Sequence, residues 1–309
     1  MMSVWKKFLV VGAAKCATTT LFSYIMQHPD VYMPATKECR YFSSIGNRIC
    51  NPFTRKAVVK TVSTWEEYEH LYVGARGKIQ GDISPDYLFY YKQSISNIVA
   101  KLGSDVKIII ILRDPVERAY SGYWHLRREQ LTDLTFDAYL EMEGGFNEAE
   151  TWYGFYLKTP GLYAEAVAAY LRAFPFVKVI VFEDIAANSQ GILRDVLEFI
   201  GASPMTNFRQ PAFTNKTGKP VVTWLPKIMH NRWVNRAVSA IVGKERLNAW
   251  VIALTEINYK KPAMTERARR YLEDYYFQDV LKLEDVLKQK LPWSWVQNAK
   301  SAMSDSAGK

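Results

Sequence analysis

The sequence predicts a single α/β domain in which helices flank a doubly wound parallel sheet. Three apolar runs carry this prediction, at residues 8–11, 107–112 and 177–182. Each run is short, rich in β-branched residues and typical of a strand that is buried on both faces of a sheet. Segments with the helical spacing of apolar residues lie between them, and strands that alternate with helices favour this fold class. The 309 residues, 49% of them hydrophobic, suffice for one large core.

The other elements are expected in the intervals between these strands. A weaker strand candidate covers residues 78–82, and Asp114-Pro115 ends the central strand. Helices are expected at residues 19–26, 163–173, 192–200 and 264–283. We expect residues 1–297 to form the domain and the small, polar residues 298–309 to form a disordered tail.

The charge of the chain favours anionic ligands. Lys and Arg number 40 against 31 Asp and Glu, which gives a net charge of +9. Because the basic residues are interspersed with acids and form no run, a nucleic-acid partner is not expected.

The cysteine count and the hydropathy pattern predict the compartment. Three cysteines, Cys16, Cys39 and Cys50, are too few for a disulfide framework and favour a reducing environment. The apolar run at residues 8–11 is too short for a signal peptide, and no stretch reaches ~18 uninterrupted apolar residues. We therefore expect a soluble cytoplasmic protein with no membrane partner.

A turn with the physical design of a P-loop follows the first strand. Small residues let its backbone approach a ligand, and hydroxyls and N–H groups at the start of a helix can hold an anion. The lysine precedes the hydroxyls by three positions, which is not the spacing of a Walker A motif. A threonine-rich helix cap is the alternative interpretation. The candidate anion-binding residues are Lys15, Cys16, Ala17, Thr18, Thr19 and Thr20.

A second candidate anion site follows the central strand. Arg113 emerges at the carboxyl end of that strand, where open parallel sheets bind ligands. Its guanidinium can hold a phosphate with two parallel hydrogen bonds. Ser121 follows about two helical turns later and can face the same ligand. An ion pair between Arg113 and Asp114 at the helix start is the alternative.

Together, the two segments resemble the sulfotransferase family that uses 3′-phosphoadenosine-5′-phosphosulfate (PAPS), in particular its bacterial and heparan sulfotransferase-like branch. The first resembles the family's 5′-phosphosulfate loop and the second its 3′-phosphate signature. Four further segments fit in order. They are His28 to Val31 with Lys37 to Phe42, Gly81 to Tyr87, Phe182-Glu183-Asp184, and the ending at residues 283–295.

The resemblance implies a fold and a chemistry, and three departures modify them. The implied enzyme has a P-loop-like fold and transfers a sulfuryl group from PAPS to a hydroxyl or amine, releasing 3′-phosphoadenosine-5′-phosphate (PAP). Ala17 replaces a common glycine, Ile83 a lysine of heparan-type members and Arg40 a frequent histidine. These departures favour a small-molecule acceptor over a glycosaminoglycan.

Roles follow from the chemistry of in-line transfer. Lys15 is the expected cation for the leaving phosphate. Arg113 and Ser121 are expected at the 3′-phosphate, together with the segment Lys216, Thr217, Gly218 and Lys219. By resemblance, Glu38 is the general base; the alternative is that it only pairs with Lys37 or Arg40. His125 is a second candidate base or a surface histidine. Scattered histidines and the lack of Cys-x-x-Cys predict no metal.

The aromatic group Trp124, Trp152, Tyr153, Phe155 and Tyr156 either lines a cleft for a ring-bearing acceptor or belongs to the core. Two other functions are alternatives: a P-loop-type nucleotide kinase or NTPase, and a non-catalytic anion-binding protein.

Overall fold

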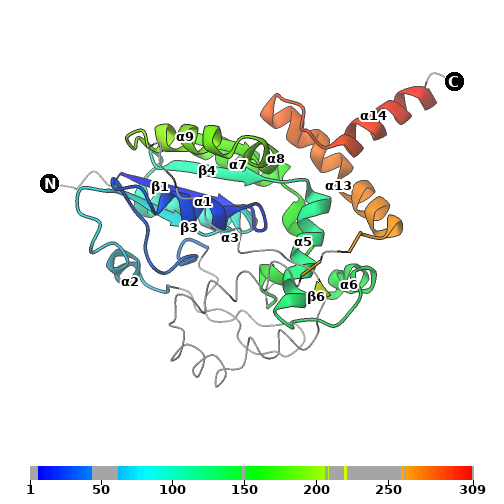
Figure 1. Ribbon diagram of the computed structural model, residues 1–309, viewed down its shortest axis with the longest axis horizontal. Helices are drawn as coiled ribbons and strands as arrows, with labels where there is room; N and C mark the ends of the chain where they lie inside the picture. Colours follow the sequence, from blue (N-terminus) through cyan, green and yellow to red (C-terminus); the bar gives the residue numbers. More distant parts are fainter. Residues whose placement is uncertain are drawn as a thin grey trace.

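A five-stranded parallel sheet forms the centre of the protein (Figure 1). The computed structural model describes residues 6–43, 62–147, 150–205, 208 and 262–307, and the backbone at 219–220 and 259–260. The strands lie in the order β2-β3-β1-β4-β5. They are β1 (Lys7–Gly12), β2 (Val31–Tyr32), β3 (Ile79–Ile83), β4 (Lys107–Leu112) and β5 (Val177–Val181).

The apolar runs form the strands that the sequence predicts. All six residues of β1 are buried, as are five of the six in β4, because both strands lie inside the sheet and are covered on both faces. The strand expected at 177–182 ends one residue early, since Phe182 already belongs to helix α8. Away from this sheet, β6 (Lys219–Pro220) and β7 (Tyr259–Lys260) pair antiparallel.

Helices flank the sheet in two packed groups. One group pairs α1 with α9, and in the other α7 packs against α3, α4 and α13. This arrangement confirms the predicted α/β class and the helices expected around residues 19–26, 163–173, 192–200 and 264–283. The α-helices are α1 (Thr18–Ile25), α2 (Trp65–His70), α3 (Asp86–Phe89), α4 (Tyr91–Leu102), α5 (Pro115–Arg128), α6 (Phe136–Met142), α7 (Ala164–Ala173), α8 (Phe182–Ala187), α9 (Ser189–Ile200), α13 (Glu266–Leu287) and α14 (Ser294–Ala307).

The tail differs from the sequence-based expectation. Residues 298–307 continue α14, which runs outward from the body in Figure 1, where a disordered tail was expected. Two contacts explain the order. Trp293 and Val296 are buried at the start of this segment, and Lys300 pairs with Glu284 of α13.

The strand order creates a switch point beside β1. The chain leaves β1 towards β2 and β3 on one side and then crosses to β4 on the other. In open parallel sheets, ligands bind at the carboxyl ends of the strands where the order reverses. The fold therefore predicts a ligand site at the turns that follow β1 and β4.

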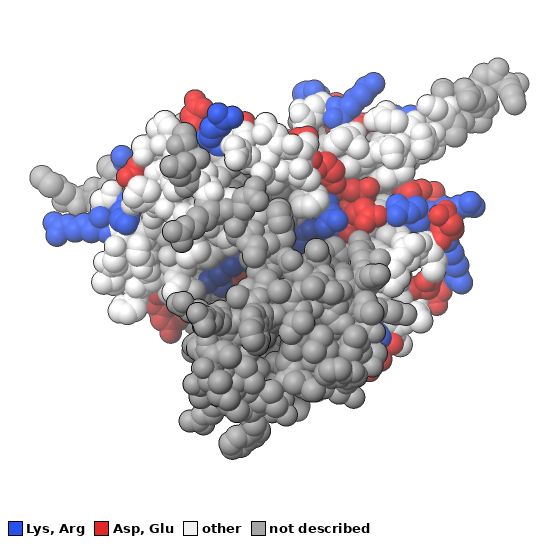
Figure 2. Space-filling view, viewed as in Figure 1, with Lys and Arg blue, Asp and Glu red and all other residues white. Residues whose placement is uncertain are grey.

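The surface carries charges of both signs. On the face shown in Figure 2, Lys and Arg side chains are mixed with Asp and Glu over the described part. Within the described residues, no helix is long and apolar enough to cross a membrane.

Candidate active site

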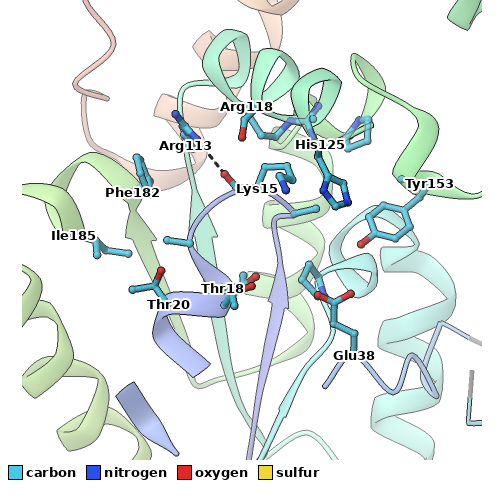
Figure 3. A pocket seen from close by; sticks show the side chains of 18 of the residues that line it. Lys15, Thr18, Thr20, Glu38, Arg113, Arg118, His125, Tyr153, Phe182 and Ile185 are labelled. Carbon is cyan, nitrogen blue, oxygen red and sulfur yellow. Dashed lines mark hydrogen bonds between the residues drawn. The ribbon is translucent and has the colours of Figure 1, made fainter. Parts of the chain in front are cut away.

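A cavity of about 810 Å³ opens at the carboxyl ends of the central strands. Its walls come from the turn after β1, from Pro85 after β3, from α5 after β4 and from α8 after β5. This is the position that the switch point predicts. Figure 3 shows the side chains of Lys15, Arg113, His125 and Glu38 converging on this space from different segments.

The turn after β1 exposes the start of α1 to the cavity. Lys15 and Ala17 have positive φ values of 71° and 64°, which reverse the chain ahead of the helix. The N-cap of α1 is Ala17, and no side chain caps the helix. The threonine-rich cap interpretation is therefore wrong, and the N-terminal N–H groups of α1 are left for a ligand.

Lys15 is a desolvated cation at the centre of the cavity wall. Burial, together with the charge of Arg128, lowers the pKa of its ammonium to about 8, and Glu38 opposes this shift. A neighbouring anion would reverse this shift, because it stabilises the charged form. Lys15 is thus arranged to gain from an arriving phosphate or sulfate.

Arg113 lies beside the same turn. Its Nη1 donates a hydrogen bond to the Lys15 carbonyl at 3.3 Å, and its guanidinium lies 4.5 Å from the centre of the Phe182 ring. Asp114 does not pair with it in the described structure: that carboxylate caps α5 by accepting from the Val116 N–H at 2.9 Å. The ion-pair alternative is therefore wrong, and Arg113 faces the cavity.

One face of α5 lines a whole side of the cavity. Ser121 and His125 lie there as candidates, and Arg118, Gly122 and Arg128 lie there as well. These positions are spaced three and four apart, as one face of an α-helix requires. Sequence analysis missed Arg118 and Arg128, although this periodicity, extended from Ser121, would have found both.

Glu38 reaches the cavity from a strained loop. Glu38 and Arg40 both have positive φ values, 61° and 58°, and the Glu38 N–H donates to the Ile83 carbonyl at 3.1 Å. Lys37 donates to Oε1 of Glu38 at 3.1 Å, and Arg40 donates to Oε2 at 2.6 Å. Glu38 therefore lines the cavity and is also paired with its two neighbours.

The buried carboxylate of Asp82 holds the loop of Glu38 and Arg40 through a hydrogen-bond network. Asp82 accepts hydrogen bonds from Ser84 Oγ at 2.8 Å, Tyr87 Oη at 2.9 Å and Cys39 Sγ at 3.3 Å. Ser84 Oγ in turn accepts the backbone N–H of Arg40 at 3.2 Å. This network fixes the backbone on both sides of Cys39 and explains how two positive φ values persist there.

His125 is held as a neutral imidazole. Arg128, which can only donate, bonds to Nδ1 of His125 at 3.0 Å, so Nδ1 accepts and the ring proton lies on Nε2. Burial lowers the pKa of His125, and the charges of Lys15 and Arg128 add to this effect, so that the pKa falls to about 3. The ring is therefore a hydrogen-bond donor in this state and a weak base.

The family assignment follows from comparison with known sequences. Residues 6–286 match the family model described as the sulfotransferase domain. The chain belongs to the sulfotransferase family. This confirms the resemblance drawn from the motifs.

Relatives of this sulfotransferase include large animal enzymes. The bifunctional heparan sulfate N-deacetylase/N-sulfotransferase 3 of Mus musculus is 24% identical over 94% of the chain and 31% of its own length. The heparan sulfate glucosamine 3-O-sulfotransferase 3B1 of Mus musculus is 23% identical over 69% of the chain and 50% of its own length. The chain thus spans about a third to a half of these relatives.

A bacterial crystal structure matches more completely. The sulfotransferase from Alicyclobacillus acidocaldarius is 28% identical, covers 93% of this chain and 97% of its own, and superimposes with a TM-score of 0.72. Its length and architecture therefore correspond to the chain as a whole, which confirms the sulfotransferase fold.

The three departures from the family pattern have structural meanings in this sulfotransferase. Ala17 occupies a left-handed conformation in which glycine carries no steric cost. Ile83 is buried in β3 and brings no charge to the cavity. Arg40 places a cation on Glu38.

Two groups of candidate anion-binding residues are not seen with side chains in the cavity wall. The Cys16 thiol is buried, has its pKa raised to about 11 by burial, and is not part of the cavity wall, so only its backbone can serve a ligand. Lys216, Thr217 and Gly218 lie outside the described residues, and only the backbone of Lys219 is described.

The aromatic group divides between cavity and core. Trp152, Tyr153 and Tyr156 line the cavity, whereas Trp124 and Phe155 are buried in the core.

Within the described residues, no group of three or more His, Cys, Asp or Glu side chains is arranged to hold a metal.

Proposed function

We propose that this sulfotransferase transfers a sulfuryl group from PAPS to a hydroxyl or amine of a small-molecule acceptor. The observation that supports this most strongly is the convergence of Lys15, Arg113, Arg128 and the uncapped start of α1 on one cavity. Fixed cations and N–H dipoles in a partly enclosed site stabilise developing negative charge, which in-line transfer requires.

The donor would lie across the end of β1. The start of α1 and Lys15 suit the 5′-phosphosulfate, and Arg113 with Ser121 suits the 3′-phosphate, as the resemblance implies. Phe182 and Ile185 form an apolar wall beside Arg113 in Figure 3, suited to the flat face of an adenine.

The proposed reaction is an in-line displacement at sulfur. The acceptor's oxygen or nitrogen forms a bond to sulfur while the bond from sulfur to the bridging phosphate oxygen breaks. That oxygen leaves with the electron pair as part of PAP, and the Lys15 ammonium neutralises it. The acceptor's proton passes to a carboxylate on the opposite side.

Glu38 is the better of the two candidate bases. His125 is neutral, its Nδ1 lone pair is already used by Arg128, and its lowered pKa of about 3 makes it a poor proton acceptor. Its Nε2 proton suits a hydrogen bond to an oxygen that gains negative charge in the transition state. Glu38 is left as the carboxylate on the cavity wall.

A ring-bearing acceptor fits the aromatic side of the cavity. A second cavity of about 540 Å³ shares Tyr153 and Tyr156 with the first and adds Phe89 and Tyr90 to its walls. The Phe89 and Tyr156 rings stack with their centres 5.9 Å apart. Planar apolar faces of this kind complement an aromatic or alicyclic acceptor better than a long sulfated chain.

Calorimetric titration of the purified protein with PAP, without magnesium, tests the donor site, and ATP is the control. Tight PAP binding with weak ATP binding is expected. Equal affinity for the two nucleotides, or magnesium-dependent ATP turnover, would overturn the proposal and favour an NTPase. A panel of phenols, alcohols and amines with PAPS then identifies the acceptor class.

A further inference from the structure

Glu38 is restrained in a way that conflicts with its proposed role. Both of its carboxylate oxygens are held by cations, Oε1 by Lys37 and Oε2 by Arg40. A cation on each carboxylate oxygen occupies the place from which an acceptor would give that oxygen its proton. One of the two partners must therefore release Glu38 before it can accept a proton.

A second carboxylate lies buried behind the same loop. Asp86 at the start of α3 is fully buried, and neither of its side-chain oxygens has a hydrogen-bond partner in the described structure. The Ser43 hydroxyl donates to the Arg40 carbonyl at 2.8 Å and is close enough to Asp86 to lower the pKa of that carboxyl. A buried carboxylate without a partner is costly and is rare unless a cation can reach it.

Arg40 is the cation that can reach both carboxylates. Its Nη2 holds Glu38, while its Nε is buried without a hydrogen-bond partner, and its charge interacts with that of Asp86. Its backbone is fixed, because the N–H donates to Ser84 Oγ and the carbonyl accepts from Ser43 Oγ. With the backbone held, movement of Arg40 between the two carboxylates would have to occur by a change of side-chain rotamer.

We propose that Arg40 is a positioning residue that exchanges between Glu38 and the buried carboxylate of Asp86, and that its movement to Asp86 frees Oε2 of Glu38 to accept the acceptor's proton. This inference rests on the proposed function, since it assigns Glu38 as the base. Lys37 stays on Oε1 of Glu38. Its Nζ also donates a hydrogen bond of 2.7 Å to Thr19 Oγ1, so it connects Glu38 to the start of α1.

The exchange depends on the charge of Asp86. Burial raises the pKa of this carboxyl to about 7, and the positive charge of Arg40 counteracts the shift. Below that pH Asp86 is neutral and attracts Arg40 weakly, so Glu38 stays covered; above it the ionised Asp86 competes for Arg40. The titratable groups that act on Asp86 are Arg40, Glu38, Tyr87, Tyr153 and Tyr170.

Hydrolysis of PAPS to PAP and sulfate tests the exchange, because water replaces the unidentified acceptor. Water's oxygen bonds to sulfur, PAP leaves, and Glu38 takes the proton. In Asp86→Asn the neutral amide cannot draw Arg40 away. We expect kcat to fall at least tenfold at pH 8, the KM for PAPS to stay within twofold, and the rise of kcat through pH 7 to disappear.

The double variant separates this role from simple structural support. In an Arg40→Gln background Glu38 is already uncovered, so adding Asp86→Asn should change kcat less than twofold. An equal loss in both backgrounds, or wild-type kcat and pH profile in Asp86→Asn, would overturn the proposal. Glu284→Gln, which alters a buried carboxylate of α13 that pairs with Lys300, should leave the pH profile unchanged.

Thermal unfolding provides a readout that needs no turnover. At pH 8, Arg40→Gln should lower the Tm more in the wild-type background than in the Asp86→Asn background, and the difference should vanish at pH 5.5. Additive shifts at both pH values would overturn the relation between Arg40 and Asp86. PAP binding, measured separately, shows whether the donor site itself has failed.

Discussion

Arg113 donates a hydrogen bond to the carbonyl oxygen of Lys15 at 3.3 Å. The residue that we assign to the 3′-phosphate thus holds the turn that we assign to the 5′-phosphosulfate. A hydrogen bond thus joins the two ends of the proposed donor site in the ligand-free protein. Substitution of either residue should therefore affect both ends.

Arg113→Ala should weaken PAP binding by roughly 2–4 kcal/mol, because it removes a charge-assisted contact and loosens the turn. Arg113→Lys should lie between wild type and alanine, since an ammonium keeps the charge but lacks the planar fork. Calorimetry measures both affinities, and Arg194→Ala on the exposed face of α9 is the control. Unchanged affinity in Arg113→Ala would remove Arg113 from the site.

Lys15 should make donor binding sensitive to pH. Since the pKa of its free ammonium is lowered to about 8, PAP affinity should fall above that pH as the charge is lost, by up to about tenfold per unit. Proton uptake on binding should be greatest near pH 8 to 9. Calorimetry in buffers of different ionisation enthalpy measures this uptake.

The matched variant for this prediction is Lys15→Met, which should bind PAP about 2–4 kcal/mol more weakly at pH 7 and lose the uptake near pH 8. If proton uptake persists in Lys15→Met, another group is responsible for it.

Glu38→Gln should leave PAP affinity within about threefold and abolish turnover, because the amide keeps the shape but cannot accept a proton. His125→Gln should retain measurable turnover, since an amide N–H can replace the Nε2 donor. Steady-state assays with PAPS and the best acceptor measure both variants. Turnover that survives in Glu38→Gln but not in His125→Gln would reverse the two assignments.

Ala17→Gly should stabilise the protein by about 0.5–1 kcal/mol. Ala17 adopts a φ of 64°, which is strained for a residue with a Cβ and free of steric cost for glycine. Chemical unfolding measures the change. Ala14→Gly, in the same turn but at a negative φ, should destabilise instead, because glycine gains more entropy on unfolding. Equal effects of the two substitutions would contradict this explanation.

The sequence was sufficient where short-range patterns decide the structure. The apolar runs marked the buried strands of the sheet, and the small residues beside Lys15 marked the turn. It missed β2, because a strand of two residues has no periodicity to detect. It did not show that the Cys16 side chain is buried away from the cavity, because composition does not show which side of a turn a side chain occupies.

The pairing around Glu38 was beyond the reach of sequence patterns. Lys37 and Arg40 are neighbours in the chain and were recognised as alternative partners. Asp86 lies 86 − 40 = 46 residues after Arg40, and only the packing of the loop against α3 brings them together. The family pattern gave no guidance here, since Arg40 departs from it.

The single face of α5 has a consequence for donor choice. Arg118, Ser121, His125 and Arg128 lie along one helix, and the seven steps from Ser121 to Arg128 span roughly 10 Å at ~1.5 Å per residue. If the donor binds as proposed, this rigid helix fixes the distance between the side chains that meet its 3′-phosphate and those near its sulfur. Donor choice would then depend on the spacing of the two anionic groups of the nucleotide as well as on its total charge.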